Sequence, residues 1–413
     1  MSVRFPGLEA AQVRCRTCLL FLSLVLLLPG QVLVGQALAG AKEDVAALAP
    51  SALVLVMDAQ GNELVAQNAD EPFVPASVAK IVTAWAAMEV LGGDYRFQTS
   101  FYLDDKRVLY VRGGGDPFLI SEELALLAPA LVSAVGKQPL AGIVIDARYY
   151  PSSLSIPGVE DSSRSFDALN SALAVNFNTI NAVRRGNKIE PGEKQTPITP
   201  LAISQFRARG PNGKGRISLN QDPAMSLRYA GELLAAFIAR ADGSVKGKIS
   251  PGPVPAGLAA VYVHRQSRTL AEILVEMLRG SNNYVANQVF LEIGGRRLGG
   301  PVSLEKSLQV ARQILVAHDL AGAIRLEEGS GLSRGNRFTA RGLAKVLNLF
   351  APHTGLLVSG KEAAYKTGTL EGVRTLAGYT NTSSHGQVRF VISLKGNDGA
   401  MRFRLLKAIE SAL

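Results

Sequence analysis

The segment Ser77–Leu91 reads SVAKIVTAWAAMEVL, is apolar on nearly every side of a helical wheel, and ends at Gly92-Gly93. A helix with one apolar stripe can lie on a surface, but a helix that is apolar all round has to be covered on every side. The sequence therefore predicts a buried helix, with Trp85 in the core. A chain of 413 residues, of which 47% are hydrophobic, is long enough to surround that helix and to form two or more domains.

Strand patterns lie near both ends of the chain. Residues 52–67 alternate on either side of Gln60-Gly61-Asn62, which predicts a hairpin. Three further alternating runs, AAYKTGT, TLAGYT and QVRFVISL, begin at Ala363, and a last helix begins near Ala400. Early strands, late strands and a terminal helix indicate one α/β (α+β) domain whose chain is interrupted.

The interruption has a different pattern. Residues 97–264 contain short alternating runs, tight turns and loops rich in Pro and Gly, which predicts an inserted, mostly-β domain. Helical periods return at 269–278 and 283–293. The expected division is a signal peptide at 1–39, the first part of the α/β domain at 40–96, the inserted domain at 97–264 and the second part at 265–413.

The N-terminus reads as an export signal. Arg14 and Arg16 precede an apolar run, and the small-residue site Ala37-Leu38-Ala39 follows it. The run is too short for a membrane span, so we expect cleavage near Gly40, no transmembrane anchor in the mature protein and secretion across the inner membrane into the periplasm. Both cysteines of the chain lie inside this segment, so they predict neither a disulfide nor a metal site.

The net charge of +10 fits plain solubility or a weak attraction to anionic wall and membrane surfaces. Four scattered histidines offer no zinc ligand set, and we expect no metal and no other cofactor. Gly113-Gly114-Gly115 has neither the lysine nor the following helix of a phosphate loop, so it predicts a tight turn. No nucleic-acid partner is expected.

Ser77 and Lys80 form the first chemical motif. Three residues apart on a helix, they share a face, so a neutral Lys80 amine can take the proton of the Ser77 hydroxyl as that hydroxyl attacks a carbonyl. The S-x-x-K pattern alone is weak, because Ser303 and Lys306 also match it, on what we expect to be an exposed helix face. Burial and the nearby cation of Lys366, in the third motif below, should lower the pKa of Lys80.

Two further motifs follow at a distance. Ser281-Asn282-Asn283 lies between the two late helices, where a hydroxyl and an amide could relay a proton and hold a substrate amide. Lys366-Thr367-Gly368-Thr369 lies in an expected strand. There a cation and a hydroxyl would bind a carboxylate, and Gly368 would let a substrate backbone lie against the strand edge. Order, spacing and context make the three motifs far more specific together than singly.

With these motifs the chain resembles the class C low-molecular-mass penicillin-binding proteins, the D-alanyl-D-alanine carboxypeptidase/endopeptidase family. Matching stretches cover most of the mature chain: PASVAKIVTA, GGGDPFL, ALAVNFNT, SNNYVAN, GSGLSR and KTGTLEGVRTLAGY. The 204 positions from Ser77 to Ser281 also match the family's wide gap between its first two motifs. The resemblance implies a transpeptidase fold like that of penicillin-binding proteins and serine β-lactamases. It also implies cleavage of peptidoglycan stem peptides and inhibition by β-lactam antibiotics.

The resemblance also implies roles for the motif residues. Ser77 would be the nucleophile and Lys80 its base, while Ser281 and Asn283 would assist proton transfer and orient the peptide. Lys366 and Thr367 would hold the terminal carboxylate of the substrate. The backbone N–H groups of Ser77 and Thr369 would form the oxyanion hole.

Some family members bind the free end of the stem peptide's diamino acid through an aspartate and an arginine. By position, Asp161 and Arg334 are the candidates here. The tryptophan-containing stretch expected before the aspartate is replaced by IPGVE, so a solvated loop and an ordinary ion pair remain open as interpretations.

Three alternatives stay open. The GLSRG segment around Ser333 fits a nucleophile elbow, with His385 downstream, although the polar RLEEGS before it favours a loop that borders the cleft. Within the same fold, the chain could be a serine β-lactamase or an esterase. A non-catalytic peptidoglycan-binding module is the third alternative. The sequence does not separate carboxypeptidase from endopeptidase.

Overall fold

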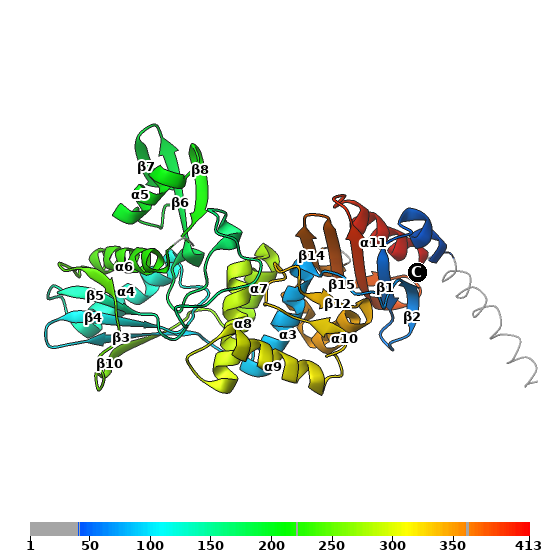
Figure 1. The fold of residues 1–413 in the computed structure, drawn as a ribbon, viewed down its shortest axis with the longest axis horizontal. Helices are drawn as coiled ribbons and strands as arrows, with labels where there is room; N and C mark the ends of the chain where they lie inside the picture. Colours follow the sequence, from blue (N-terminus) through cyan, green and yellow to red (C-terminus); the bar gives the residue numbers. More distant parts are fainter. Residues whose placement is uncertain (1–39, 41, 220–221, 361–362) are drawn as a thin grey trace, which may run out of the picture.

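The computed structural model describes residues 40, 42–219, 222–360 and 363–413. The predicted signal peptide lies outside the described residues. Within them the molecule is elongated, with two sheet-containing parts at opposite ends and a group of helices between them (Figure 1). Among the described residues, no helix combines the length and the apolar character needed to cross a membrane.

One end is built on a six-stranded antiparallel sheet in the order β13-β14-β15-β16-β1-β2. The predicted hairpin and the three late strands all lie in this sheet, and its two edge strands are β2 and the short β13. The strands are β1 (Leu53–Met57), β2 (Glu63–Gln67), β13 (Val358–Ser359), β14 (Ala363–Leu370), β15 (Val373–Thr382) and β16 (Gly386–Lys395). Because β1 pairs with β16, the first and last described strands are neighbours in the interior of the sheet.

The two faces of this sheet pack against different helices. Leu53 and Leu55 of β1 join the core that contains helix α3 (Ala79–Leu91) and helix α10 (Ala340–Phe350). Val54 and Val56 point the other way and join the core formed with α11 (Met401–Ala412). The period of two in a strand therefore divides one apolar run between two cores. The predicted helices at the C-terminus and at 77–91 lie on opposite faces.

Helix α3 is buried as its composition predicts. Residues Ala79 to Ala87 are all buried, and Trp85 is 5% exposed. Around it lie α10, α7 (Leu270–Gly280) and α8 (Asn283–Leu298), and α9 (Leu304–Ala317) packs in turn on α8 (Figure 1).

The other end holds a five-stranded mixed sheet in the order β10-β3-β4-β5-β9 and a three-stranded sheet in the order β7-β6-β8. The strands are β3 (Gln98–Leu103), β4 (Val108–Gly113), β5 (Gly142–Asp146), β6 (Thr179–Arg185), β7 (Lys188–Pro191), β8 (Gly213–Ser218), β9 (Ile249–Pro251) and β10 (Ala260–Arg265). The smaller sheet and helix α5 (Pro200–Arg209) project from the body in Figure 1.

This segment is mixed, not mostly β as predicted. It contains the helices α4 (Ser121–Val135), α5 (Pro200–Arg209) and α6 (Pro223–Arg240). The physical reason is the parallel pairing of β4 with β5 and of β5 with β9. Parallel neighbours need a long crossover, here α4 between β4 and β5, and strand direction cannot be read from alternating residues.

The two connections into this segment lie side by side. The Gln266 N–H donates to the Phe97 carbonyl at 2.9 Å, and the Leu270 N–H donates to the Tyr95 carbonyl at 2.8 Å. The segment also has a core of its own between its sheet and helices α4 and α6. On this ground we propose residues 97–264 as an inserted domain and residues 40–96 with 265–413 as the domain that it interrupts.

Candidate active site

Ser77 lies in the 3-10 turn Ala76–Val78, directly before α3. Ala76 has φ of 49°, a left-handed conformation that is strained for a residue with a side chain. The turn is held from the sheet, because the Thr375 hydroxyl of β15 donates to the Pro75 carbonyl at 2.7 Å. The contact with β15 thus helps to hold the strained turn that places Ser77 directly before the helix.

Lys80 is fully buried, and its Nζ contacts three oxygens. The distances are 3.0 Å to Ser77 Oγ, 2.8 Å to Asn283 Oδ1 and 2.7 Å to the Ser330 carbonyl. The amide oxygen and the carbonyl can only accept hydrogen bonds. A neutral amine has two N–H donors, so these acceptors engage both and leave its lone pair directed at the Ser77 hydroxyl. The arrangement suits proton transfer from Ser77 to Lys80.

The electrostatics of the site favour that neutral form. Burial and, to a smaller extent, the Lys366 cation lower the pKa of Lys80 to about 7, while Glu328 acts in the opposite direction. Both causes expected from the sequence, burial and a second cation, are therefore present. Burial, together with Arg402, also lowers the pKa of Lys366 to about 8.

The second motif reverses the chain between two helices. Ser281 ends α7 in a left-handed conformation, with φ of 51°, and the Asn282 side chain caps α8 by accepting from the Val285 N–H at 3.1 Å. Asn283 is then the first residue of α8, and from there its side chain reaches Lys80. Asparagine is a favoured N-cap residue, whereas a left-handed conformation is uncommon for a residue with a side chain such as Ser281.

The third motif lies in β14, where Lys366 and Gly368 are buried and Thr367 and Thr369 face the other way. A methyl group on Gly368 would lie 2.0 Å from Thr375 Oγ1 and 2.8 Å from the Pro75 carbonyl. Gly368 is thus required for the close packing of β14 against the Ser77 turn, a role that the sequence did not indicate. Among the described residues, β13 pairs only with Ala364 and Tyr365, so no described strand covers that edge of β14 beyond them.

A loop between the short strands β11 (Ile324–Arg325) and β12 (Arg337–Phe338) completes the site. It supplies the Ser330 carbonyl to Lys80, and a side chain on Gly331 would collide with the Ala76 carbonyl. The sequence predictions missed Glu328 and Ser330. Their signal was the pair of glutamates directly before GSGLS, which read only as a polar loop.

The alternative nucleophile Ser333 lies in this loop. Its hydroxyl donates to Glu327 Oε2 at 2.6 Å, and the segment before it is no central strand. The structure therefore contradicts an elbow and supports a loop that borders the cleft. The second S-x-x-K pattern is a helix cap: Ser303 accepts from the Lys306 N–H, and Lys306 Nζ binds two backbone carbonyls.

A cavity of about 740 Å³ brings the motifs together. Its lining includes Ser77, Ser281, Asn283, Thr369 and Arg334. Lys80 reaches the same place by its bonds to Ser77 and Asn283.

Of the two residues proposed for the diamino acid, only Arg334 lines this cavity. Its guanidinium donates to the Glu371 carbonyl at 2.6 Å. Asp161 is exposed, is not among the lining residues and acts electrostatically on Arg209. The acidic residues on the cavity wall are Glu160, Asp167 and Glu371.

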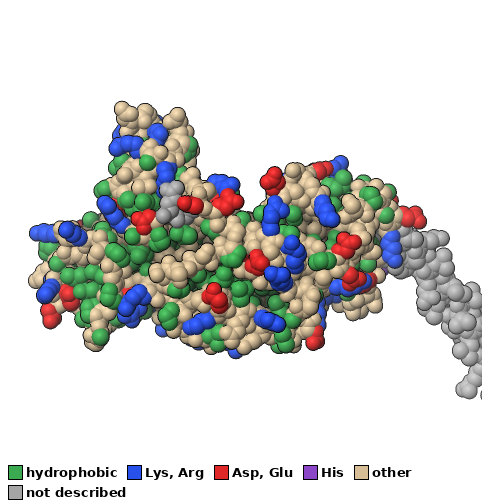
Figure 2. All heavy atoms as spheres, viewed as in Figure 1, with side chains coloured by type: hydrophobic (Ala, Val, Ile, Leu, Met, Phe, Trp, Pro, Cys, Tyr) green, Lys and Arg blue, Asp and Glu red, His purple; other side chains and the backbone are tan. Residues whose placement is uncertain are grey.

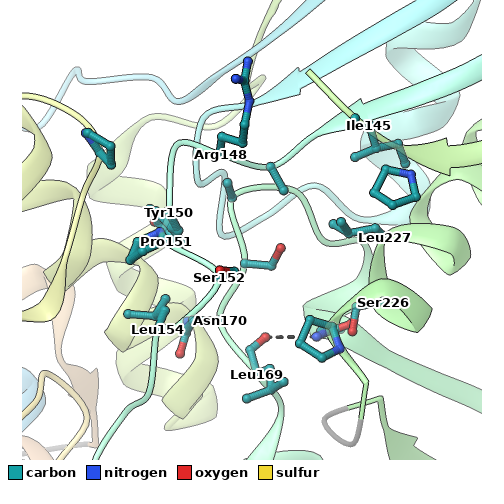
Figure 3. A pocket seen from close by; sticks show the side chains of 18 of the residues that line it. Ile145, Arg148, Tyr150, Pro151, Ser152, Leu154, Leu169, Asn170, Ser226 and Leu227 are labelled. Atoms are coloured by element: carbon teal, nitrogen blue, oxygen red, sulfur yellow. Dashed lines mark hydrogen bonds between the residues drawn. The ribbon is translucent and has the colours of Figure 1, made fainter. Parts of the chain in front are cut away.

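A second cavity, of about 400 Å³, is lined mainly by apolar side chains and prolines, among them Tyr150, Pro151, Leu154 and Leu227 (Figure 3). None of the motif residues lines it. On the face shown in Figure 2, basic and acidic side chains are interspersed, and no single basic stripe is present on that face. Within the described ranges no cluster of His, Cys, Asp and Glu has the arrangement of a metal site.

The comparison with known families decides the assignment. The model of the D-Ala-D-Ala carboxypeptidase 3 (S13) family matches residues 35–212 and 210–358, well over half of the chain. The chain belongs to this family. The expected family, fold and enzyme class, a serine-type D-Ala-D-Ala carboxypeptidase hydrolase, are thereby confirmed.

Relatives of this S13 chain agree with the match. A D-alanyl-D-alanine carboxypeptidase of Actinomadura sp. (strain R39) is 28% identical over 452 residues, which cover 88% of this chain and 81% of that protein. The crystal structure of penicillin-binding protein 4 (DacB) of Haemophilus influenzae aligns with a TM-score of 0.71 at 20% identity, covering 89% of this chain and 97% of that one. A predatory endopeptidase of Bdellovibrio bacteriovorus, acylated by penicillin G, aligns with a TM-score of 0.53 at 17% identity, covering 87% and 90%.

Proposed function

We propose that this S13 enzyme cleaves after D-alanine in peptidoglycan stem peptides, as a carboxypeptidase, an endopeptidase or both, through an acyl-enzyme on Ser77. The observation that carries the proposal is the contact of 3.0 Å between Lys80 Nζ and Ser77 Oγ, with the two other contacts of that nitrogen made to pure acceptors. A base in reach of the nucleophile and oriented by further groups is the signature of covalent catalysis.

The acylation step follows from this geometry. Lys80 Nζ takes the Ser77 proton while Oγ forms a bond to the carbonyl carbon of the D-alanine. The backbone N–H groups of Ser77 and Thr369 stabilise the oxyanion. When the tetrahedral intermediate collapses, the C–N bond breaks and the leaving amine takes the proton from Lys80, with the Ser281 hydroxyl as a relay. Water then attacks the ester and releases Ser77.

Substrate binding is proposed for three places. The uncovered edge of β14 beyond Tyr365 can pair with an extended peptide, as sheet edges do in other peptide complexes. Lys366 and Thr367 would hold the terminal carboxylate. Arg334, on the cavity wall, would bind the free end of the diamino acid. Asp161 stays a prediction for the same end, and Glu160, Asp167 and Glu371 are the acidic residues on that wall.

Penicillins are proposed as inhibitors that acylate Ser77. The Bdellovibrio endopeptidase of similar fold is acylated by penicillin G, and the Haemophilus protein has been crystallised with a β-lactam. The substrate also implies a location in the cell envelope. We propose that the chain acts in the periplasm after removal of residues 1–39.

Fluorescent penicillin and purified cross-linked muropeptides test the proposal. We expect a label on Ser77 that persists for minutes or longer, no label on Ser77→Ala, and mass-spectrometric loss of D-alanine or cleavage of D-alanyl cross-links. Rapid turnover of the drug would identify a β-lactamase instead. Wall binding without any cleavage by the wild-type enzyme would identify a binding module.

A further inference from the structure

Glu328 is a buried carboxylate beside the catalytic base that the acylation step does not use. It is 0% exposed, and both its oxygens accept hydrogen bonds from its own loop. Oε2 accepts from the Ser330 N–H at 2.7 Å and the Ser330 hydroxyl at 2.6 Å. Oε1 accepts from the N–H groups of Gly331 at 2.7 Å and Ser333 at 3.3 Å, and from Asn336 Nδ2 at 2.8 Å. Five donors thus converge on one side chain.

The loop that Glu328 organises is also fastened to both helices of the site. The Gly329 N–H donates to Asn287 Oδ1 of α8 at 2.8 Å, and the Gly329 carbonyl accepts from the Thr83 hydroxyl of α3 at 2.6 Å. The next carbonyl, that of Ser330, accepts from Lys80 at 2.7 Å. The position of this acceptor depends on the backbone turn that the carboxylate holds.

We propose that Glu328 is a positioning residue for the Lys80 base, because its carboxylate holds the loop in the conformation that presents the Ser330 carbonyl to Lys80. The charge of this carboxylate has a second effect. It raises the pKa of Lys80, whereas burial and the Lys366 cation lower it. Without the Ser330 acceptor, the Lys80 amine loses one of the two bonds that direct its lone pair at Ser77. The proposal rests on the proposed role of Lys80.

The pH dependence of acylation by fluorescent penicillin tests the role. Glu328→Gln keeps the size of the side chain but removes its charge and places an N–H₂ group among donors. We expect the maximal acylation rate to fall about 10- to 100-fold, as for small displacements of a catalytic group. We also expect the acidic limb of the profile to move to lower pH, because the carboxylate raises the pKa of Lys80.

Two further variants separate positioning from stability. Glu328→Asp keeps the charge on a shorter side chain, so the limb should stay near its wild-type pH while the maximal rate remains low. Glu292→Gln removes another buried carboxylate, away from Lys80, and should change neither the limb nor the maximal rate. If Glu328→Gln does not fold, as judged by circular dichroism, Glu328→Asp decides by its maximal rate.

The proposal would be overturned if folded Glu328→Gln had the wild-type acylation rate and an unmoved acidic limb. It would also be overturned if Glu328→Asp had the wild-type maximal rate. A loss of thermal stability with no change in acylation would overturn it as well. Failure of the catalytic assignment itself would look different, because Ser77→Ala would then still be labelled.

Discussion

Acylation of Ser77 by a penicillin should have a bell-shaped pH dependence, because two lysines with similar pKa values need opposite protonation states. In the proposed mechanism Lys80, with a pKa of about 7, has to be neutral to take the proton, and Lys366, with a pKa of about 8, has to be charged to bind the carboxylate. The fraction of enzyme in the productive state is then about 0.6 at pH 7.5 and about 0.03 at pH 5.5 and pH 9.5. The second-order acylation rate should therefore fall about 20-fold two units from its maximum.

The assay is the rate of labelling by fluorescent penicillin, at drug concentrations well below saturation, so that the profile reports groups of the free enzyme. In Lys366→Met the basic limb should disappear, and the acidic limb should move to higher pH because a cation that lowers the pKa of Lys80 is gone. Lys306→Met, in the second S-x-x-K pattern, is the matched control and should leave the profile unchanged. A profile that is flat from pH 5 to pH 10 would refute the reasoning.

Two other predictions concern stability. Gly368→Ala places a methyl group 2.0 Å from Thr375 Oγ1 and 2.8 Å from the Pro75 carbonyl. We therefore expect the free energy of unfolding, measured in urea, to fall by about 1–3 kcal/mol and labelling to become slower. Wild-type values for both would contradict the close packing of β14 against the Ser77 turn. Glu292 is buried under two tyrosine hydroxyls, and burial raises its pKa to about 7. A raised pKa in a carboxyl group means that the folded state binds more protons than the unfolded state. The free energy of unfolding of the wild type should therefore fall by about 3 kcal/mol relative to that of Glu292→Gln as the pH rises from about 4.5 to above 7. A difference that does not change with pH would contradict this.

The sequence predicted the elements that local pattern determines. The all-apolar segment after Ser77 is the buried helix α3, the alternating runs are strands of the larger sheet, and the break between two helical periods is the reversal at Ser281. Each of these signals is contained within a few neighbouring residues. The helices of residues 97–264 were missed because parallel strand order, which requires them, depends on residues far apart in the chain.

The sequence by itself determined which side chains are available for catalysis and on which elements they stand. Only the tertiary structure decided that Gly368 faces the Ser77 turn and that Glu328 lies in the loop that supplies an acceptor to Lys80. It also placed Arg334, and not Asp161, on the cavity wall. The reason is physical. Identity and local period are properties of adjacent residues, whereas pKa values, close contacts and cavities arise from groups that only folding brings together.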